Sequence, residues 1–281
     1  MPTKSANQKL TPLELLNSRR YDPQRKPQPD QFLFHAKGKK IGSLQNLVIV
    51  SGKQKNGKSR YISAIIAAAL SGSALFSLSV QFPTNRNRLA LFDTEQGDFD
   101  FYRQIETIKQ FSGLSSLHNF DAYNLREDDP GESLKMIEAY LTANPECSIL
   151  VIDGLLDLIL DFNNVIDSKR LINFLKKITK QFNVLIIAVI HRGKGNDTNI
   201  GNLGAMADRL AQSVLKVEKD KERGVFNLSS EFMRSDEEFD PVSIWYNGTT
   251  WEEVPFLDTS STPVKPISRK PDQYEYHEHT Q

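Results

Sequence analysis

A glycine-rich segment between two apolar stretches constrains the fold of this chain more than any other feature. The segment fits the pattern G-x-x-x-x-G-K-[ST] at every specified position. Its residues are Gly52, Lys53, Gln54, Lys55, Asn56, Gly57, Lys58 and Ser59. The apolar stretch before it, 47–50, is predicted to be a buried strand, and the Ala- and Ile-rich stretch after it, 60–70, a buried helix. A strand, a glycine-rich turn and a helix in this order predict a phosphate-binding loop.

The residue types of this loop suit a bound nucleoside triphosphate. Glycine lets the backbone curl so that its N–H groups converge on a phosphate, and the following helix points its positive end at the same anion. Lys58 is expected to reach the β- and γ-phosphate oxygens, and Ser59 to ligate Mg²⁺. We assign the whole loop and Arg60 to the binding of ATP with Mg²⁺. Lys53 and Lys55 are expected to be solvated, with phosphate contacts as the alternative.

Apolar runs alternate with helical patterns along most of the chain. Continuous apolar runs predict strands at 47–50, 89–92, 149–152 and 184–190, with a shorter one at 118–123. Helical spacing predicts helices at 60–70, 98–111, from Pro130 to before Asn144, and at 171–182 with Asp167 or Ser168 as its cap. This alternation is typical of an α/β fold with a mostly parallel central sheet and helices on both faces. Three later runs, 214–217, 225–228 and 242–246, predict an antiparallel extension at one edge.

Two carboxylates follow strands of this predicted sheet. The run 148–153 ends in Asp153 and has the pattern of a Walker B segment, whose aspartate holds a Mg²⁺-bound water. The run 89–92 is followed by Asp93, Thr94 and Glu95. A carboxylate at that place can accept a hydrogen bond from a water in line with the γ-phosphate, as a base or as an orienting group. Glu95 is the candidate and Asp93 its competitor; the alternative is a solvated acidic loop.

Composition limits the classes of protein that fit. The 281 residues are 39% hydrophobic and 25% charged, which suits one large α/β domain, and the formal net charge of +0 excludes an overall basic field for gripping nucleic acid. Cys147 is the only cysteine, which excludes an internal disulfide and a cysteine-based zinc site. The longest apolar run, 149–160, is interrupted by Asp153 and Asp157, and the N-terminus has no apolar signal segment. We expect a cytoplasmic protein with no membrane partner.

The two ends differ from the middle in composition. Residues 1–30 are rich in Lys, Arg, Gln and Pro, with one short helix predicted at 10–16, and residues 258–281 carry three prolines among polar residues. These patterns predict three parts: a flexible basic arm at 1–30, an ATPase domain at 31–257 and a polar tail at 258–281.

In the order and spacing of these motifs the chain resembles the RecA-like P-loop ATPases, over roughly 32–254. The resemblance implies that Glu95 activates the attacking water. It also implies that His191, which ends the strand 184–190, acts as a sensor of the γ-phosphate. Arg192 and Lys194, which follow, are candidates for contact with DNA or with a neighbouring subunit.

Within that superfamily the chain is similar to plasmid RepA-type hexameric helicases and to AAA_25 ATPases. The similarity rests on a Gly-x-x-Gly segment, Gly201 to Gly204, and on a charged loop at 193–201 of the kind that reaches a central pore. Arg234 aligns loosely with the arginine that such rings insert into the adjacent subunit's site, which implies a homo-oligomer such as a hexamer. Related helicases often have Lys-x-Arg where this chain has Phe232-Met233-Arg234. The missing lysine keeps a surface ion pair open as the alternative for Arg234.

Three functions compete at this point. The leading one is an oligomeric, helicase-like ATPase that acts on single-stranded DNA in replication or mobilisation of a mobile element, with the basic arm as a local patch. The alternative is a regulatory or scaffolding ATPase that switches protein partners without nucleic acid. A small-molecule phosphotransferase is the third; it needs an arginine-bearing lid and an acceptor pocket, and the sequence offers no clear candidate for either.

Overall fold

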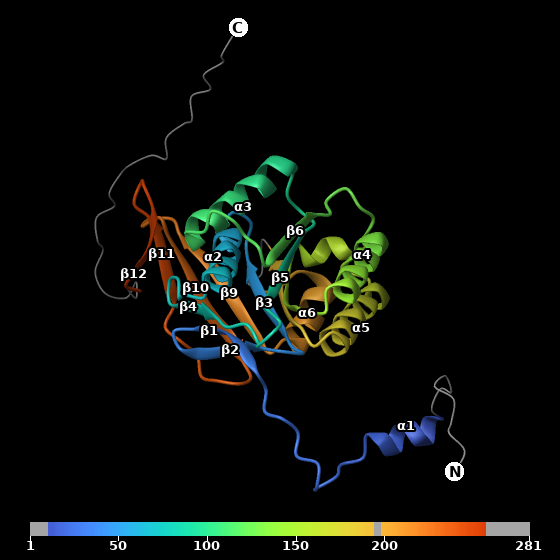
Figure 1. Cartoon of the computed structure of the whole chain (residues 1–281). Coiled ribbons are helices and arrows are strands. Elements are labelled where there is room, and N and C mark those ends of the chain that lie inside the picture. The colour runs from blue at the N-terminus through green and yellow to red at the C-terminus, as the bar shows by residue number, and fades with distance from the viewer. Residues whose placement is uncertain (1–10, 194–197, 257–281) are drawn as a thin grey trace. The chain divides into compact units, whose positions relative to one another are not determined.

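A nine-stranded sheet forms the centre of the computed structural model, which describes residues 11–193 and 198–256 (Figure 1). Six neighbouring strands of this sheet are parallel. In spatial order they are β9 (Ser213–Asp220), β3 (Leu47–Gly52), β8 (Leu185–His191), β7 (Cys147–Asp153), β5 (Arg88–Asp93) and β6 (Phe120–Asn124). The expected α/β class with a mostly parallel central sheet is confirmed.

Helices cover both faces of the sheet (Figure 1). One face carries α2 (Lys58–Ser71) and α3 (Asp98–Ser112). The other carries α4 (Pro130–Ala143), α5 (Val165–Gln181), α6 (Gly201–Leu210) and the short 3-10 helix η1 (Leu155–Leu158). Successive side chains of a strand point to opposite faces. Val48 and Val50 of β3 therefore join the core under α2, and Leu47 and Ile49 join the core under α5.

The sheet continues beyond β9 in three antiparallel strands, β10 (Val225–Met233), β11 (Val242–Tyr246) and β12 (Trp251–Val254). The predicted antiparallel extension is therefore present at one edge. Its first predicted strand, 214–217, belongs to β9, which is parallel to β3 and antiparallel to β10. β9 thus joins the two parts of the sheet.

A second, three-stranded sheet has no counterpart in the sequence analysis. Its antiparallel strands, in spatial order, are β2 (Lys39–Ser43), β1 (Phe32–Ala36) and β4 (Leu78–Val80). They are three to five residues long, too short for a clear periodic signal.

The predicted start of α5 is wrong. Its cap is Asn164, whose side chain accepts hydrogen bonds from the backbone N–H groups of Ile166 and Asp167. The helix thus begins before the predicted caps, Asp167 and Ser168. Val165 and Ile166 in its first turn are exposed, so this turn adds no buried residue to the helical pattern.

The chain divides into two units, residues 1–30 and 31–281. The described part of the first unit contains α1 (Pro12–Ser18), which begins with a capping box formed by Thr11 and Glu14 and buries none of its residues. The predicted tail at 258–281 lies outside the described residues. Across the described ranges, no helix combines the length and the apolar character needed to cross a bilayer.

Candidate functional site

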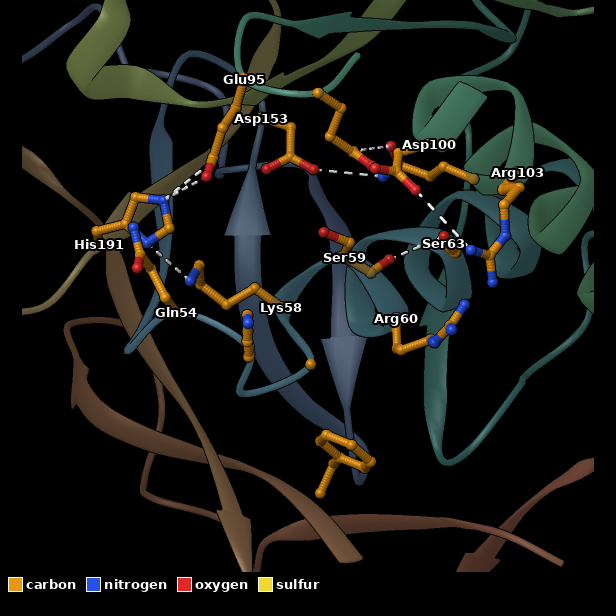
Figure 2. Close-up of a pocket in the computed structure, with 15 residues that line it drawn as sticks. Gln54, Lys58, Ser59, Arg60, Ser63, Glu95, Asp100, Arg103, Asp153 and His191 are labelled. Atoms are coloured by element: carbon orange, nitrogen blue, oxygen red, sulfur yellow. Dashed lines mark hydrogen bonds and ion pairs between the residues drawn. The ribbon is translucent and has the colours of Figure 1, made fainter. Parts of the chain in front are cut away.

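The carboxyl ends of four neighbouring parallel strands lie at one edge of the sheet. Gly52 at the end of β3 is aligned with His191 at the end of β8, and Asp93 at the end of β5 with Asp153 at the end of β7. β7 and β8 are also neighbours, so all four ends share this edge. Residues at and after these ends line a pocket of 480 Å³ (Figure 2). Open α/β sheets bind their ligands at this edge.

The predicted phosphate loop forms one wall of the pocket. Gly57 has a φ of 90°, a conformation that favours glycine, and a Cβ at this position would lie 2.4 Å from the ring of Phe226. A Cβ at Gly52 would lie 2.5 Å from the backbone oxygen of Val217. The loop is therefore packed closely against β9 and β10, and both of its motif glycines are required by the surrounding structure.

The remaining side chains of the loop differ in their surroundings. Gln54, Lys55 and Ser59 are exposed and line the pocket, whereas Lys53 is exposed and is not among the lining residues. Arg60 lines the pocket from the first turn of α2, with its guanidinium 5.3 Å from the centre of the Trp251 ring.

Lys58 is only 7% exposed although it carries a charge. Its Nζ donates hydrogen bonds to the backbone oxygens of Gly52 at 2.9 Å and Lys53 at 3.1 Å, and it lies 3.1 Å from Nδ1 of His191. Burial lowers the pKa of Lys58, and two nearby carboxylates oppose this effect. The ammonium group is therefore held inside the loop by acceptors of the protein itself.

Asp93 and Glu95, the two candidates for the water-activating carboxylate, have different surroundings. Asp93 is buried, and its Oδ1 accepts hydrogen bonds from the backbone N–H groups of Glu95 at 2.9 Å and Gln96 at 2.8 Å. Asp93 thus stabilises the turn after β5. The Glu95 side chain is 41% exposed and lines the pocket, and a hydrogen bond from His191 lowers its pKa. Of the two, Glu95 is the carboxylate placed to meet a ligand.

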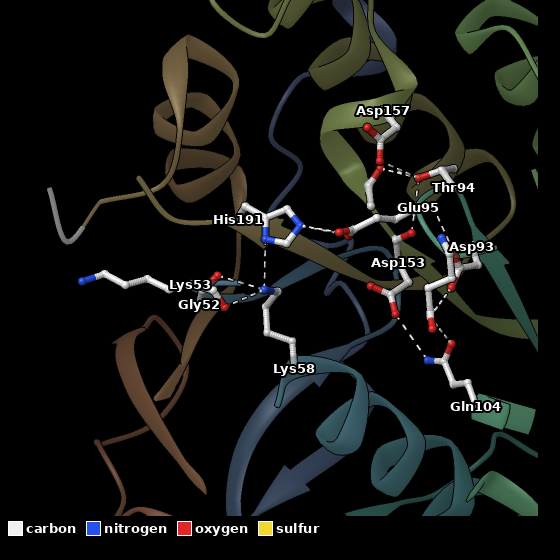
Figure 3. A network of polar contacts seen from close by, with 12 residues as sticks. Gly52, Lys53, Lys58, Asp93, Thr94, Glu95, Gln104, Asp153, Asp157 and His191 are labelled. Atoms are coloured by element: carbon white, nitrogen blue, oxygen red, sulfur yellow. Dashed lines mark hydrogen bonds and ion pairs between the residues drawn. The ribbon is translucent and has the colours of Figure 1, made fainter. Parts of the chain in front are cut away.

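Asp153 is a buried carboxylate of the pocket (Figure 3). Burial, with the charge of Asp93 as the second cause, raises the pKa of Asp153 to about 7. Nε2 of Gln104 donates to Oδ2 of Asp153 at 3.3 Å, and Oε1 of Gln104 accepts from Nε2 of Gln96 at 2.6 Å. The same Nε2 of Gln96 also donates to Asp93. Two amide side chains thus link the buried carboxyls of β5 and β7.

His191 lies between Lys58 and Glu95 (Figure 3). Its Nε2 is 3.0 and 2.9 Å from the two carboxylate oxygens of Glu95, and its Nδ1 faces Nζ of Lys58. Lys58, Glu95, Asp153 and His191, which the sequence analysis assigned to one site, are therefore all brought together in this pocket.

The residue after His191 differs from expectation. The Arg192 side chain is 2% exposed; its Nε donates to Oγ of Ser51 at 3.1 Å, and it forms an ion pair with Glu231. Arg192 therefore faces the protein interior, and its predicted contact with DNA or a neighbouring subunit is wrong. Lys194, the other residue considered for that contact, lies outside the described residues.

The Gly-x-x-Gly segment at the start of α6 marks two close approaches of the backbone. A Cβ at Gly201 would lie 2.8 Å from Phe162, and one at Gly204 would lie 2.7 Å from Asn199. Gly201 thus lets α6 begin directly against the loop that follows η1, and Gly204 leaves room for Asn199 in the segment just before the helix.

Arg234 is not part of this pocket. It follows β10, which ends beside the start of β9, and β9 starts beside the start of β3. Arg234 therefore lies at the amino edge of the parallel strands, opposite the phosphate loop. Its guanidinium lies 5.6 Å from the centre of the Phe232 ring and donates to the backbone oxygen of Arg209.

Comparison with solved structures identifies the fold. The chain matches the crystal structure of the RadB recombinase with a TM-score of 0.53 and 16% identity, over 77% of this chain and 93% of that chain. The chain has a RecA-like fold. The sequence itself matches no model of a known protein family and no curated protein.

In this RecA-like fold, elements outside the sequence motifs complete the site. α3 contributes Asp100, Arg103 and Gln104 to the pocket, and β10 contributes Phe226. The sequence analysis did not predict these residues, because no local pattern marks a glutamine or a phenylalanine as the partner of a distant loop. The pocket as a whole combines cationic and backbone donors suited to phosphate with carboxylates suited to a cation and a water.

Proposed function

We propose that this chain is an ATPase that hydrolyses ATP in a Mg²⁺-dependent reaction. The observation that carries the proposal is the convergence of the phosphate loop with Glu95, Asp153 and His191 in one pocket. The RecA-like fold supports it, because the pocket lies where open α/β sheets bind their ligands.

Each part of the pocket has one task in this proposal. The backbone N–H groups of the loop and the N-terminus of α2 bind the phosphates. Lys58 contacts the β- and γ-phosphate oxygens and neutralises their charge. Glu95 accepts a hydrogen bond from the attacking water and orients it in line with the γ-phosphorus. Arg60 lines the same pocket, with its guanidinium 5.3 Å from the centre of the Trp251 ring, and adds a cation for the binding of ATP.

The residues present fit a Mg²⁺ ion. Mg²⁺ prefers oxygen ligands and keeps several waters, and this pocket offers the hydroxyl of Ser59 and the carboxylate of Asp153. Burial, with the charge of Asp93 as the second cause, raises the pKa of Asp153, and a bound divalent cation would stabilise its ionised form. Among the described residues, no three His, Cys, Asp or Glu side chains form a metal site alone, so waters and phosphate oxygens complete the coordination in this proposal. Bound Mg²⁺ supplies charge neutralisation on the transferred phosphoryl group.

We extend the proposal to a homo-oligomer of the RepA or AAA_25 kind that acts on DNA in the cytoplasm, in replication or mobilisation of a mobile element. Arg234 lies at the edge opposite its own pocket, which supports a role in the pocket of a second copy. The likeness to a recombinase supports a nucleic acid partner. The arm contains Arg19, Arg20, Arg25 and Lys26, which can contact a phosphate backbone.

Phosphate release from Mg-ATP tests the proposed reaction. Lys58→Ala should abolish hydrolysis, and Glu95→Gln should slow it by about 100-fold or more while calorimetry still detects nucleotide binding. Glu127→Gln, which changes an exposed glutamate outside the pocket, is the matched control and should hydrolyse at the parental rate. Hydrolysis by Glu95→Gln at the parental rate would show that another group activates the water.

The hydrolysis rate with and without single-stranded DNA separates the two remaining functions. Stimulation that declines as the salt concentration rises supports action on DNA. A rate that DNA leaves unchanged at low salt supports the alternative, a regulatory ATPase that switches protein partners.

A further inference from the structure

The ring of His191 connects the two residues with opposite tasks in the proposed reaction. Lys58 is the phosphate-binding cation, and Glu95 is the water-activating carboxylate. One nitrogen of the ring contacts Lys58 at 3.1 Å, and the other contacts Glu95 at 2.9 and 3.0 Å (Figure 3). Within the described part of the chain, His191 is the side chain that is hydrogen-bonded to both.

The chemistry of the two partners determines where the imidazole carries its proton. An ammonium group has three donors and no acceptor, so Nδ1 of His191 must accept from Lys58. Nε2 then carries the hydrogen and donates it to the carboxylate of Glu95, which has acceptors only. His191 is therefore the neutral Nε2–H tautomer, and Lys58 is the group that selects this tautomer.

The ammonium group of Lys58 has no donor left over. Its three N–H groups go to the backbone oxygens of Gly52 and Lys53 and to Nδ1 of His191. An arriving phosphate oxygen must take the place of one of these acceptors. The two carbonyl groups belong to the loop backbone, whereas the imidazole is a neutral side chain, and an oxyanion is the stronger acceptor for an ammonium group.

We propose that His191 is a positioning residue that couples phosphate binding at Lys58 to the release of Glu95. Without nucleotide, Lys58 orients the imidazole so that its Nε2–H donates a hydrogen bond to the carboxylate of Glu95. When Lys58 turns to a phosphate oxygen, Nδ1 loses its donor, the ring can rotate or change tautomer, and Glu95 becomes available to the water. This inference rests on the proposed function and gives His191 a task different from direct contact with the γ-phosphate.

Nitrogen NMR of the full chain labelled with ¹⁵N-histidine tests the contact without nucleotide. The chain has five histidines, and the spectrum of His191→Gln assigns the His191 signals. The parent should show the Nε2–H tautomer with Nδ1 as an acceptor, and Lys58→Ala should shift Nδ1 and mix the tautomers. A His191 spectrum that Lys58→Ala leaves unchanged overturns the proposal.

The same spectra with nucleotide test the coupling. Mg²⁺ with a non-hydrolysable ATP analogue should move the Nδ1 signal of the parent towards its position in Lys58→Ala. Calorimetry on the same sample distinguishes two failures. An analogue that does not bind overturns the proposed function, and the coupling with it. An analogue that binds and leaves the His191 signals unchanged overturns the coupling alone.

The affinity of a His191 variant separates coupling from direct sensing. Removing the imidazole frees one donor of Lys58, so His191→Ala should bind the analogue about two- to tenfold more tightly, the range of one average hydrogen bond. A residue that contacts the γ-phosphate directly would lose affinity when removed, and such a loss overturns the proposal. His118→Ala, which removes an exposed histidine outside the pocket, is the matched control and should bind like the parent.

Discussion

Replacing Asp153 by asparagine should stabilise the Mg²⁺-free protein at neutral pH, by an amount that shrinks as the pH falls. Burial raises the pKa of Asp153 from 3.8 to about 7. Between these values the folded protein keeps a proton on Asp153 that the unfolded chain releases. The free energy of unfolding therefore falls as the pH rises from about 4 to about 7. Asparagine has nearly the same shape and no charge, so it avoids this loss.

The size of the effect follows from the two pKa values. Their difference, at about 1.4 kcal/mol per pH unit, corresponds to a loss of about 4 kcal/mol that is complete above pH 7. Relaxation around the ionised group reduces this value, so we expect Asp153→Asn to gain about 1 to 4 kcal/mol at pH 8. The gain should be roughly a third as large at pH 5.

Urea unfolding in EDTA, followed by circular dichroism between pH 5 and pH 8, measures this gain. Asp240→Asn, which removes an exposed carboxylate, is the control and should follow the pH dependence of the parent. A constant difference between Asp153→Asn and the parent over this range would refute the reasoning. A variant that is less stable than the parent at pH 8 would also refute it. Either result would mean that ionisation of Asp153 costs the folded protein little free energy.

Three further results are expected. Gly57→Ala should weaken nucleotide binding by about tenfold or more, because alanine is strained at this φ and its Cβ meets the β10 aromatic ring; Gly131→Ala, which meets nothing within 4 Å, is the control, and calorimetry compares the two. Gln104→Leu removes the donor to the buried carboxylate and should raise the Mg²⁺ concentration for half-maximal hydrolysis by about tenfold in a metal titration. Mixtures of Arg234→Ala and Lys58→Ala subunits should regain part of the activity that each lacks alone, and no recovery at any ratio would argue against action in a neighbouring subunit.

The parts of this structure that could be predicted from the sequence are those with a local cause. A continuous apolar run is buried on both faces wherever it occurs, which is why β3, β7 and β8 were found within one or two residues at each end. The loop from Gly52 to Ser59 could be predicted equally well, because the spacing of its residues reflects the geometry of one turn around one phosphate. The order of these segments along the chain then predicted which side chains would meet at the carboxyl edge.

The remaining features depend on partners far away in the sequence. Arg192 follows a strand and carries a charge, and such a residue is usually exposed; it is buried because Ser51 and Glu231 from other strands supply its acceptors. Gln104 lies on the buried face of α3, and only the three-dimensional structure places it against Asp153. The role of Arg234 was implied only by a loose resemblance, and its place at the opposite edge of the sheet follows from strand pairing that no local pattern encodes.

The packing of β10 against the phosphate loop means that the C-terminal strands stabilise the conformation of the loop. The ring of Phe226 lies against Gly57, and the hydroxyl of Tyr61 in α2 donates hydrogen bonds of 2.7 and 2.6 Å to the backbone oxygens of Phe226 and Val242. A chain that ended before Val225 would keep every residue of the phosphate loop but lose β10, which packs against the loop and stabilises its conformation. A partner that displaced β10 would likewise weaken phosphate binding without contacting any residue of the phosphate loop.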